Sequence, residues 1–313
     1  MTHTHSNAIK FPGPIQRRLE RSAQHFLTPP AGGAVVSFSE PPGEPALVGP
    51  DSLSWRMFKS PLVMFIGGVT AVVLQLAEPR VRAGVWDHTS FRKNPLQRLQ
   101  RTGLAAMMSV YGPRSQAEAL IARVNRLHAT VSGVSADGHA YNALDPELLN
   151  WVQLTAGYGF TAAYHAFQRP ITQPELDALF DEGRASSALY GVTGAPQTPA
   201  ESDALFERMA PKLEASPIVL EFLDIMRSVP ALPRVARPLQ RLLVKAGIDI
   251  LPPWVRERLQ LGPEWSLKRW ERWVVTRAVR MTDRLLLTSS PAVQACRRLG
   301  LPDDYLYRTT VPA

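Results

Sequence analysis

The sequence predicts an all-α protein, and the positions of proline carry most of that prediction. At five expected helix starts a serine, asparagine or aspartate directly precedes proline. This is typical of a helix start, because the polar side chain caps free backbone N–H groups and proline occupies the first helical position. The pairs are Ser60-Pro61, Asn94-Pro95, Asp145-Pro146, Ser216-Pro217 and Ser290-Pro291. Apolar residues follow at three- and four-residue spacing, and no strand-like alternation competes with them.

Three further helix starts fit the capping box, in which a hydroxyl residue and the glutamate three residues later satisfy each other's backbone N–H groups. They are Ser115 with Glu118, Thr172 with Glu175, and Thr198 with Glu201. A long helix is expected over residues 146–167. Loops are expected at 132–145 and 190–199, where glycine and proline gather.

The first fifty residues differ in composition from the rest. Proline and glycine are frequent there, around one amphipathic stretch from Ile15 to Leu27, so residues 1–50 are expected to form a flexible, irregular arm. Helices are expected from about Asp51 to Leu301, without an internal repeat. The sequence therefore predicts one multi-helix domain over residues 51–313, preceded by the arm.

The longest apolar run covers residues 61–77 and is interrupted only by Thr70 and Gln75. A membrane span needs about 20 apolar residues, and a helix that is apolar on all sides is also typical of a protein core. Gly67 and Gly68 suit close helix packing, so a buried core helix is expected here rather than a membrane segment.

The formal net charge is +8, and 29 of the 35 basic residues are arginine, since six are lysine. They are spread without a block of like charges, which argues against nucleic-acid binding and is compatible with contact to an anionic membrane surface. The single cysteine, Cys296, excludes an internal disulfide and a cysteine zinc site. Residues 1–10 show no apolar signal segment, so a cytoplasmic protein is expected, with membrane association left open.

The candidate site begins on the helix that follows the Asn-Pro pair. Arg98, Arg101 and Thr102 lie at i, i+3 and i+4, so two cations and a hydroxyl share one helical face. An apolar run follows directly and belongs in a core. Guanidinium groups beside a core need an anion, a polar ligand or a water-filled pocket. The sequence therefore predicts a pocket in which these arginines face a ligating histidine, His128, near the end of the next helix.

Each of these residues also has a purely structural interpretation, and the residues alone leave both open. His128 suits a core or surface position near the negative end of a helix dipole, and helical arginines usually face solvent. Glu78, directly after the apolar run, fits a surface position slightly better than a pocket with a raised pKa. The other histidines rank lower: His88 on an expected turn, His165 in packing, His139 in a loop, and His3 and His5 in the arm.

Several enzyme classes lack their motifs. No Glu-x-x-His pair for a di-iron site occurs, and there is no Gly-x-Ser-x-Gly, no phosphate loop and no Gly-x-Gly-x-x-Gly after a strand. Hydrolase, kinase and nicotinamide-dependent functions are therefore not expected.

An ordered series of short motifs extends from about Asp51 to Trp265. The segments are Gly67-Gly68, Leu74-Gln75-Leu76-Ala77-Glu78-Pro79, Gly84-Val85-Trp86-Asp87-His88-Thr89-Ser90-Phe91, Pro95-Leu96-Gln97-Arg98-Leu99-Gln100-Arg101-Thr102, Val110-Tyr111-Gly112, His128-Ala129-Thr130-Val131-Ser132-Gly133, Tyr141-Asn142-Ala143-Leu144-Asp145-Pro146 and Leu149-Asn150-Trp151-Val152. In this order they resemble the family of MpaB-type oxygenases and the catalytic domain of latex clearing protein, a rubber oxygenase.

The resemblance implies a globin-like helical core that holds one b-type haem. His128 matches the family's histidine before x-x-Val-x-Gly and so corresponds to the proximal iron ligand. Arg98 and Thr102 match polar residues that line the haem pocket. Arg101 falls where rubber oxygenases carry a distal lysine, and a permanently protonated arginine there argues against direct rubber cleavage. Glu78 stands where much of the family has a histidine.

The implied function is haem-dependent oxidation of an apolar substrate, such as an isoprenoid or another alkene, by dioxygen. Arg101 would polarise dioxygen bound opposite His128, while Arg98 and Thr102 would hold a propionate or a water network. Two other functions stay open. One is a non-catalytic haem- or lipid-binding protein with the same pocket; the other is a peripheral membrane scaffold that uses residues 15–27 as an interfacial helix.

Overall fold

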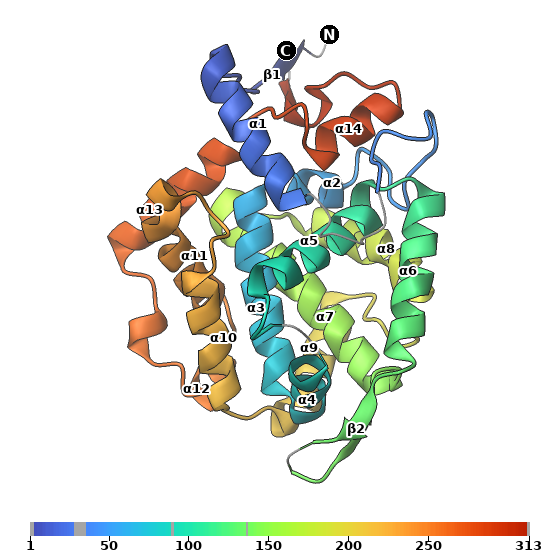
Figure 1. Cartoon of the computed structure of the whole chain (residues 1–313), viewed down its shortest axis with the longest axis vertical. Coiled ribbons are helices and arrows are strands. Elements are labelled where there is room, and N and C mark those ends of the chain that lie inside the picture. The colour runs from blue at the N-terminus through green and yellow to red at the C-terminus, as the bar shows by residue number, and fades with distance from the viewer. Residues whose placement is uncertain (1–2, 28–35, 89–90, 136, 312–313) are drawn as a thin grey trace.

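The computed structural model describes residues 3–27, 36–88, 91–135 and 137–311. Helices dominate it, which confirms the predicted all-α class (Figure 1). The helices are α1 (Gly13–Leu27), α2 (Leu53–Phe58), α3 (Pro61–Ala77), α4 (Pro79–Asp87), α5 (Pro95–Tyr111), α6 (Arg114–His128), α7 (Pro146–Ala163), α8 (Gln173–Leu189), α9 (Pro199–Met209), α10 (Pro217–Ser228), α11 (Arg237–Asp249), α12 (Pro253–Arg258), α13 (Arg269–Thr282) and α14 (Pro291–Arg298). Thr89 and Ser90 of the family-like motifs lie outside the described residues.

Two small antiparallel sheets accompany the helices. Strand β1 (His3–Ser6) pairs with β4 (Arg308–Val311), so the two ends of the chain meet, and β2 (Ser132–Val134) pairs with β3 (Ala140–Asn142). The prediction of a plain loop at 132–145 is wrong, because this segment forms the β2–β3 hairpin. Gly138, with φ of +86°, supplies the left-handed turn residue that the hairpin requires.

Helices α3 and α7 form the centre of the molecule, crossing in the middle of Figure 1. Their backbones meet at Gly67 and Gly159. A Cβ atom on Gly67 would lie 2.8 Å from the Cα atom of Phe160 and 2.9 Å from the carbonyl oxygen of Gly159. Hydrogen in place of a side chain at both positions is what allows this close crossing.

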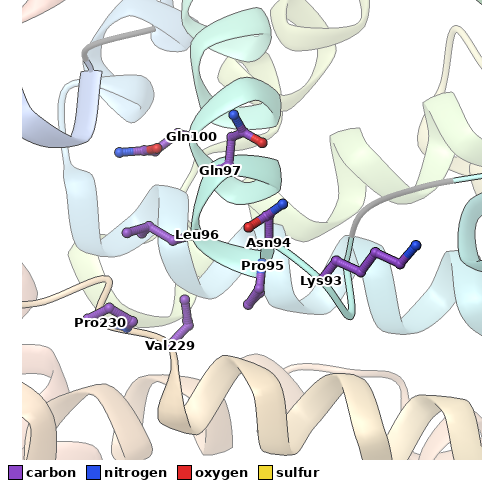
Figure 2. Close-up of a pocket in the computed structure, with 8 residues that line it drawn as sticks. All are labelled: Lys93, Asn94, Pro95, Leu96, Gln97, Gln100, Val229 and Pro230. Carbon is purple, nitrogen blue, oxygen red and sulfur yellow. The ribbon is translucent and has the colours of Figure 1, made fainter. Parts of the chain in front are cut away.

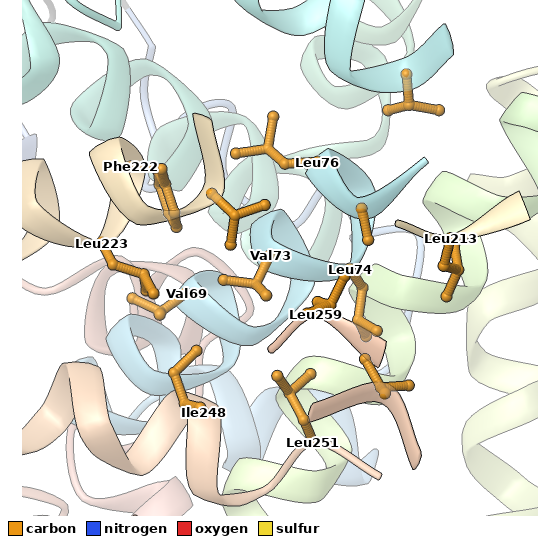
Figure 3. Close-up of a cluster of buried hydrophobic side chains, with 14 of the residues drawn as sticks. Val69, Val73, Leu74, Leu76, Leu213, Phe222, Leu223, Ile248, Leu251 and Leu259 are labelled. Atoms are coloured by element: carbon orange, nitrogen blue, oxygen red, sulfur yellow. The ribbon is translucent and has the colours of Figure 1, made fainter. Parts of the chain in front are cut away.

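The core is built around α3, as its apolar sequence predicts. Val69 and Val73 of α3 pack with Phe222 and Leu223 of α10 and with Ile248 of α11 (Figure 3). Eleven of the 17 residues of α3 are buried. Among the described residues, no single helix is long and apolar enough to span a membrane. Only α3 and α4 taken together meet that length and composition, and they bend by 112° at their junction.

Most of the predicted helix caps are confirmed. The side chains of four polar residues before proline accept backbone N–H groups of their helices: Ser60, Asp145, Ser216 and Ser290. Asn94 precedes α5 but makes no side-chain cap hydrogen bond. The capping box at Thr172 is confirmed, because the carboxylate of Glu175 accepts from the N–H of Thr172 at 3.0 Å. At the start of α9 only half of the predicted box forms: Thr198 caps the helix, but Glu201 accepts from the N–H of Gln197 at 2.8 Å.

The capping box predicted at Ser115 and Glu118 is wrong. Helix α6 already begins at Arg114, so Ser115 lies inside its first turn. The N–H and the hydroxyl of Ser115 instead donate to the carboxylate of Glu44, at 2.6 and 3.0 Å. A carboxylate from the arm therefore caps α6, where it also opposes the positive end of the helix dipole.

Residues 36–50 of the expected arm pack on the helical body. The ring of Phe38 is buried, and the guanidinium of Arg298 donates to the carbonyl oxygens of Phe38 (2.7 Å) and Glu44 (2.8 Å). Gln116 of α6 donates to the carbonyl oxygen of Glu40 at 2.8 Å. Residues 28–35 lie outside the described residues, and the division of the chain at residue 50 stays a prediction.

Candidate functional site

Helix α5 carries Arg98, Arg101 and Thr102 at the predicted helical spacing. The Thr102 hydroxyl donates to the carbonyl oxygen of Arg98 at 2.9 Å and accepts from Nη1 of the same arginine at 2.9 Å. These two hydrogen bonds hold the guanidinium of Arg98 along the helix. Arg98 is half-buried, whereas Arg101 and Thr102 are exposed.

The guanidinium of Arg98 forms no ion pair with any residue that the structure describes. Its Nε atom is enclosed and makes no hydrogen bond to any described residue. The closest aromatic contact is a cation–π approach of 5.8 Å to the ring centroid of Phe91. Burying part of a cation that has no counter-ion among the described residues costs free energy, so this position suits an anionic group that is not part of the chain.

His128 is the last residue of α6, and its imidazole is half-buried. Its Nδ1 atom is enclosed without a hydrogen-bond partner among the described residues, and the same is true of Oδ1 of Asn125, one turn earlier. The amide nitrogen of Asn125 donates to the carbonyl oxygen of Leu189 at 2.7 Å, which orients this side chain. The sequence analysis did not select Asn125. Its position three residues before His128, on the same face of the helix, could have indicated it.

The pKa shifts show that His128, Arg98 and Arg101 interact through their charges. Burial lowers the pKa of His128, and the positive charge of Arg98 lowers it further. Burial also lowers the pKa of Arg98, with a second contribution from the charge of Arg101. Arg98 of α5 is therefore close enough to His128 of α6 to favour the neutral imidazole, which is the form that binds metals.

Glu78 is buried, which corrects the slight preference for a surface position. Its side chain is 1% exposed; one oxygen accepts from the N–H of Val81 at 2.7 Å and so caps α4. The other oxygen pairs with Nε of Arg80 at 2.7 Å, and Arg80 also reaches Glu147 at 2.6 Å. These partners satisfy the carboxylate, so Glu78 joins α3 to α4 and α7 rather than serving as an acid in a pocket.

The remaining candidates have structural environments. Nε2 of His88 lies 3.0 Å from the hydroxyl of Tyr141 and links α4 to the β2–β3 hairpin. His139 and His165 are exposed, and the free thiol of Cys296 is buried. Within the described ranges, no group of three or more His, Cys, Asp or Glu side chains could hold a metal ion.

One cavity of about 510 Å³ opens at the beginning of α5 (Figure 2). It is lined by Lys93, Asn94, Pro95, Leu96, Gln97, Gln100, Val229 and Pro230. These residues surround the first turn of α5. Arg98, Arg101 and Thr102 of the predicted site are not among them.

A second cavity, also of about 510 Å³, lies beside the β2–β3 hairpin. It is lined by Glu78, Pro79, Arg80, Asp137, His139, Ala140, Pro211, Lys212 and Glu214. Several of its charged side chains are already paired: Arg80 contacts Glu78, and Lys212 contacts Glu147, which lies outside the lining. Arg98, Arg101, Thr102 and His128 line neither of the two cavities.

Open space also borders the central helices. No atom outside the immediate backbone lies within 4 Å of where a Cβ atom would stand on Gly68 of α3 or on Gly157 of α7. Both glycines are accessible although α3 and α7 cross at the centre of the molecule. At these two positions, therefore, α3 and α7 are not packed closely against another described segment.

Comparison with known proteins decides the family. A family model described as the catalytic domain of the ER-bound oxygenase mpaB/B' and rubber oxygenase matches residues 55–284. The chain belongs to this oxygenase family. Searches of curated proteins and of solved structures found no match.

The matched part of this oxygenase extends from α2 to α13 and contains all four predicted site residues. Of these, Arg98 and Thr102 are in direct contact, and Arg101 and His128 are coupled to Arg98 through charge. The family assignment confirms the resemblance seen in the motifs. The roles of the individual residues, the haem and the globin-like description of the core stay predictions.

Proposed function

We propose that this chain is a haem b-dependent oxygenase that uses dioxygen to oxidise an apolar, alkene-containing substrate. Family membership supports the reaction class. The observation that carries the cofactor is the half-buried Arg98, whose enclosed Nε atom has no hydrogen-bond partner among the described residues and whose charge lowers the pKa of His128. A haem propionate would supply the missing anion, and a neutral imidazole would supply the axial ligand.

The residues present fit a haem of the b type. His128 favours the neutral form that ligates iron. Asn125, one turn earlier, has an enclosed amide oxygen without a described donor, and a ligating histidine usually donates its other ring N–H to such an oxygen. The alternative thiolate ligand does not fit, because burial raises the pKa of Cys296 to about 12. When bound, the haem supplies the redox chemistry of dioxygen.

The side chains of α5 divide the remaining tasks. Arg98, fixed by Thr102, would bind a propionate and so orient the cofactor. Arg101 is exposed, carries a permanent charge and lies one turn further along the same face, where it would donate hydrogen bonds to polar groups that develop negative charge.

The first test measures haem content. The unaltered chain and three variants, His128→Ala, Arg101→Ala and His165→Ala, are mixed with haemin, separated from free haemin, and analysed by Soret absorbance and pyridine haemochrome. His165→Ala is the control because this histidine is exposed and outside the site. We expect one haem per chain in the unaltered protein, in the control and in Arg101→Ala, and loss of haem in His128→Ala.

Stoichiometric haem in His128→Ala with an unchanged absorption spectrum would refute the ligand assignment. Failure of the unaltered chain to take up haem would refute the cofactor and favour a lipid-binding function for the same residues. Arg101→Ala should keep its haem and change the rate of dioxygen consumption with an alkene substrate. An unchanged rate would remove Arg101 from the mechanism.

A further inference from the structure

Helix α13 exposes large apolar side chains that a protein surface normally covers. Trp270, Trp273 and Met281 are 59%, 61% and 63% exposed. The helix runs along the outer edge of the molecule (Figure 1) and packs inward on α3 and α11. Val275 and Val279 on its inner side are fully buried. The two valines therefore anchor α13 to the core, whereas the side chains of Trp270 and Trp273 remain largely exposed to solvent.

The same outer face is strongly basic. Arg269, just before Trp270, and Arg277 and Arg280, between Trp273 and Met281, are exposed. None of these three arginines forms an ion pair with a described residue. Helical geometry places them within about one third of the helix circumference around Trp273. The guanidinium of Arg277 lies 5.5 Å from the ring centroid of Trp273.

Acidic groups near α13 are directed inward and neutralised. Glu271 is buried and pairs with Lys245 at 2.8 Å. Asp283, just after the helix, is buried and pairs with Lys59 at 2.9 Å. The exposed side of α13 therefore combines tryptophan, methionine and uncompensated arginine, without a carboxylate among its residues.

The chain that precedes α1 continues this surface. The N–H of Ile9 donates to the carbonyl oxygen of Arg284 at 2.7 Å, which brings α1 next to the end of α13. Phe11 and Ile15 are exposed there, and Arg17, two residues after Ile15, is also exposed. Apolar and basic side chains thus extend from α13 onto the beginning of α1.

We propose that the exposed face of α13 is a docking surface for an anionic lipid bilayer. Tryptophan has a large apolar body and a polar N–H, a combination that suits the interface between headgroups and acyl chains. Arginine complements the negative charge of lipid phosphates and keeps its charge at any accessible pH. A helix that lies parallel to the membrane carries apolar and basic side chains on the face toward the lipid. Its opposite face is held by the protein core, as Val275 and Val279 hold α13.

The test is flotation of the full chain with two kinds of vesicle, one of neutral phosphatidylcholine and one in which part of it is replaced by anionic phosphatidylglycerol. Two variants alter the proposed surface: Trp270→Ser with Trp273→Ser, and Arg269→Glu with Arg277→Glu. The control is Arg123→Glu with Arg126→Glu, which makes the same change in net charge on exposed arginines of α6, on the other side of the molecule.

We expect the unaltered chain and the α6 control to float with anionic vesicles and not with neutral ones. One basic residue near an anionic leaflet changes the partition coefficient by roughly fivefold, so the α13 arginine pair should lower it by roughly 25-fold or more. The tryptophan pair should lose flotation as well, although its charge is unchanged. Helical circular dichroism like that of the unaltered chain would show that these variants fold.

Three results would overturn the proposal. The first is no flotation of the unaltered chain at low salt, and the second is undiminished flotation of both α13 variants. The third is a concentration-dependent dimer in sedimentation velocity that the tryptophan pair abolishes, with no vesicle binding, because α13 would then contact a second copy of the chain.

Discussion

The close crossing of α3 and α7 makes a quantitative prediction about two glycines of the same helix. In Gly159→Ala, the new methyl group would overlap the carbonyl oxygen of Gly67 and lie 3.1 Å from the backbone nitrogen of Ala71. Neither obstacle is the end of a flexible side chain, so the helices must separate. In Gly157→Ala, the methyl group meets no atom within 4 Å.

The expected free energies have opposite signs. Overpacking a tight contact costs about 1–3 kcal/mol, and alanine gains about 1 kcal/mol over glycine inside a helix. Gly159→Ala should therefore lower the free energy of unfolding by up to about 2 kcal/mol, while Gly157→Ala should raise it by about 1 kcal/mol. With the usual unfolding entropy per residue, about 1 kcal/mol corresponds to roughly 1.5 °C in a chain of this length.

The assay is urea unfolding followed by circular dichroism, supported by differential scanning calorimetry. The adjacent pair on α3 gives an independent comparison: Gly67→Ala meets the backbone of α7, whereas Gly68→Ala enters open space. If Gly159→Ala proved as stable as Gly157→Ala, the close backbone contact would not exist, and the assignment of α3 and α7 as the central pair would be refuted.

Three further predictions concern ionisable groups. Asp283→Asn leaves the buried ammonium of Lys59 without its partner and should cost about 3 kcal/mol in urea unfolding; an effect below about 1 kcal/mol would contradict this. Arg169 and the capping contacts lower the pKa of Glu175 to about 2. The ionised Glu175 therefore stabilises the fold above its ordinary pKa near 4.5, and this stabilisation is lost as the pH falls toward 2. Glu175→Gln should therefore make the free energy of unfolding less dependent on pH between 4.5 and 2. Because burial raises the pKa of Cys296 to about 12, the folded chain should resist iodoacetamide at pH 8 and react only in denaturant; rapid alkylation of the folded chain would disprove this.

The sequence by itself determined the helical class and most helix starts, because a cap and the following proline act within a few residues of one another. Ser60 and Asp145 illustrate this. It also determined that Arg98, Arg101 and Thr102 share one side of α5, since that follows from helical periodicity. Where a partner came from a distant segment, local reasoning failed, as it did when Glu44 rather than Glu118 capped α6.

Only the tertiary structure decided which helix faces meet. Burial of Glu78 depends on the 112° bend between α3 and α4 and on Arg80. The effect of Arg98 on His128 depends on how α5 lies against α6. The exposure of Trp273 depends on which side of α13 the core takes. In each case the deciding free energy comes from desolvation and from contacts between segments far apart in the chain, which no local pattern contains.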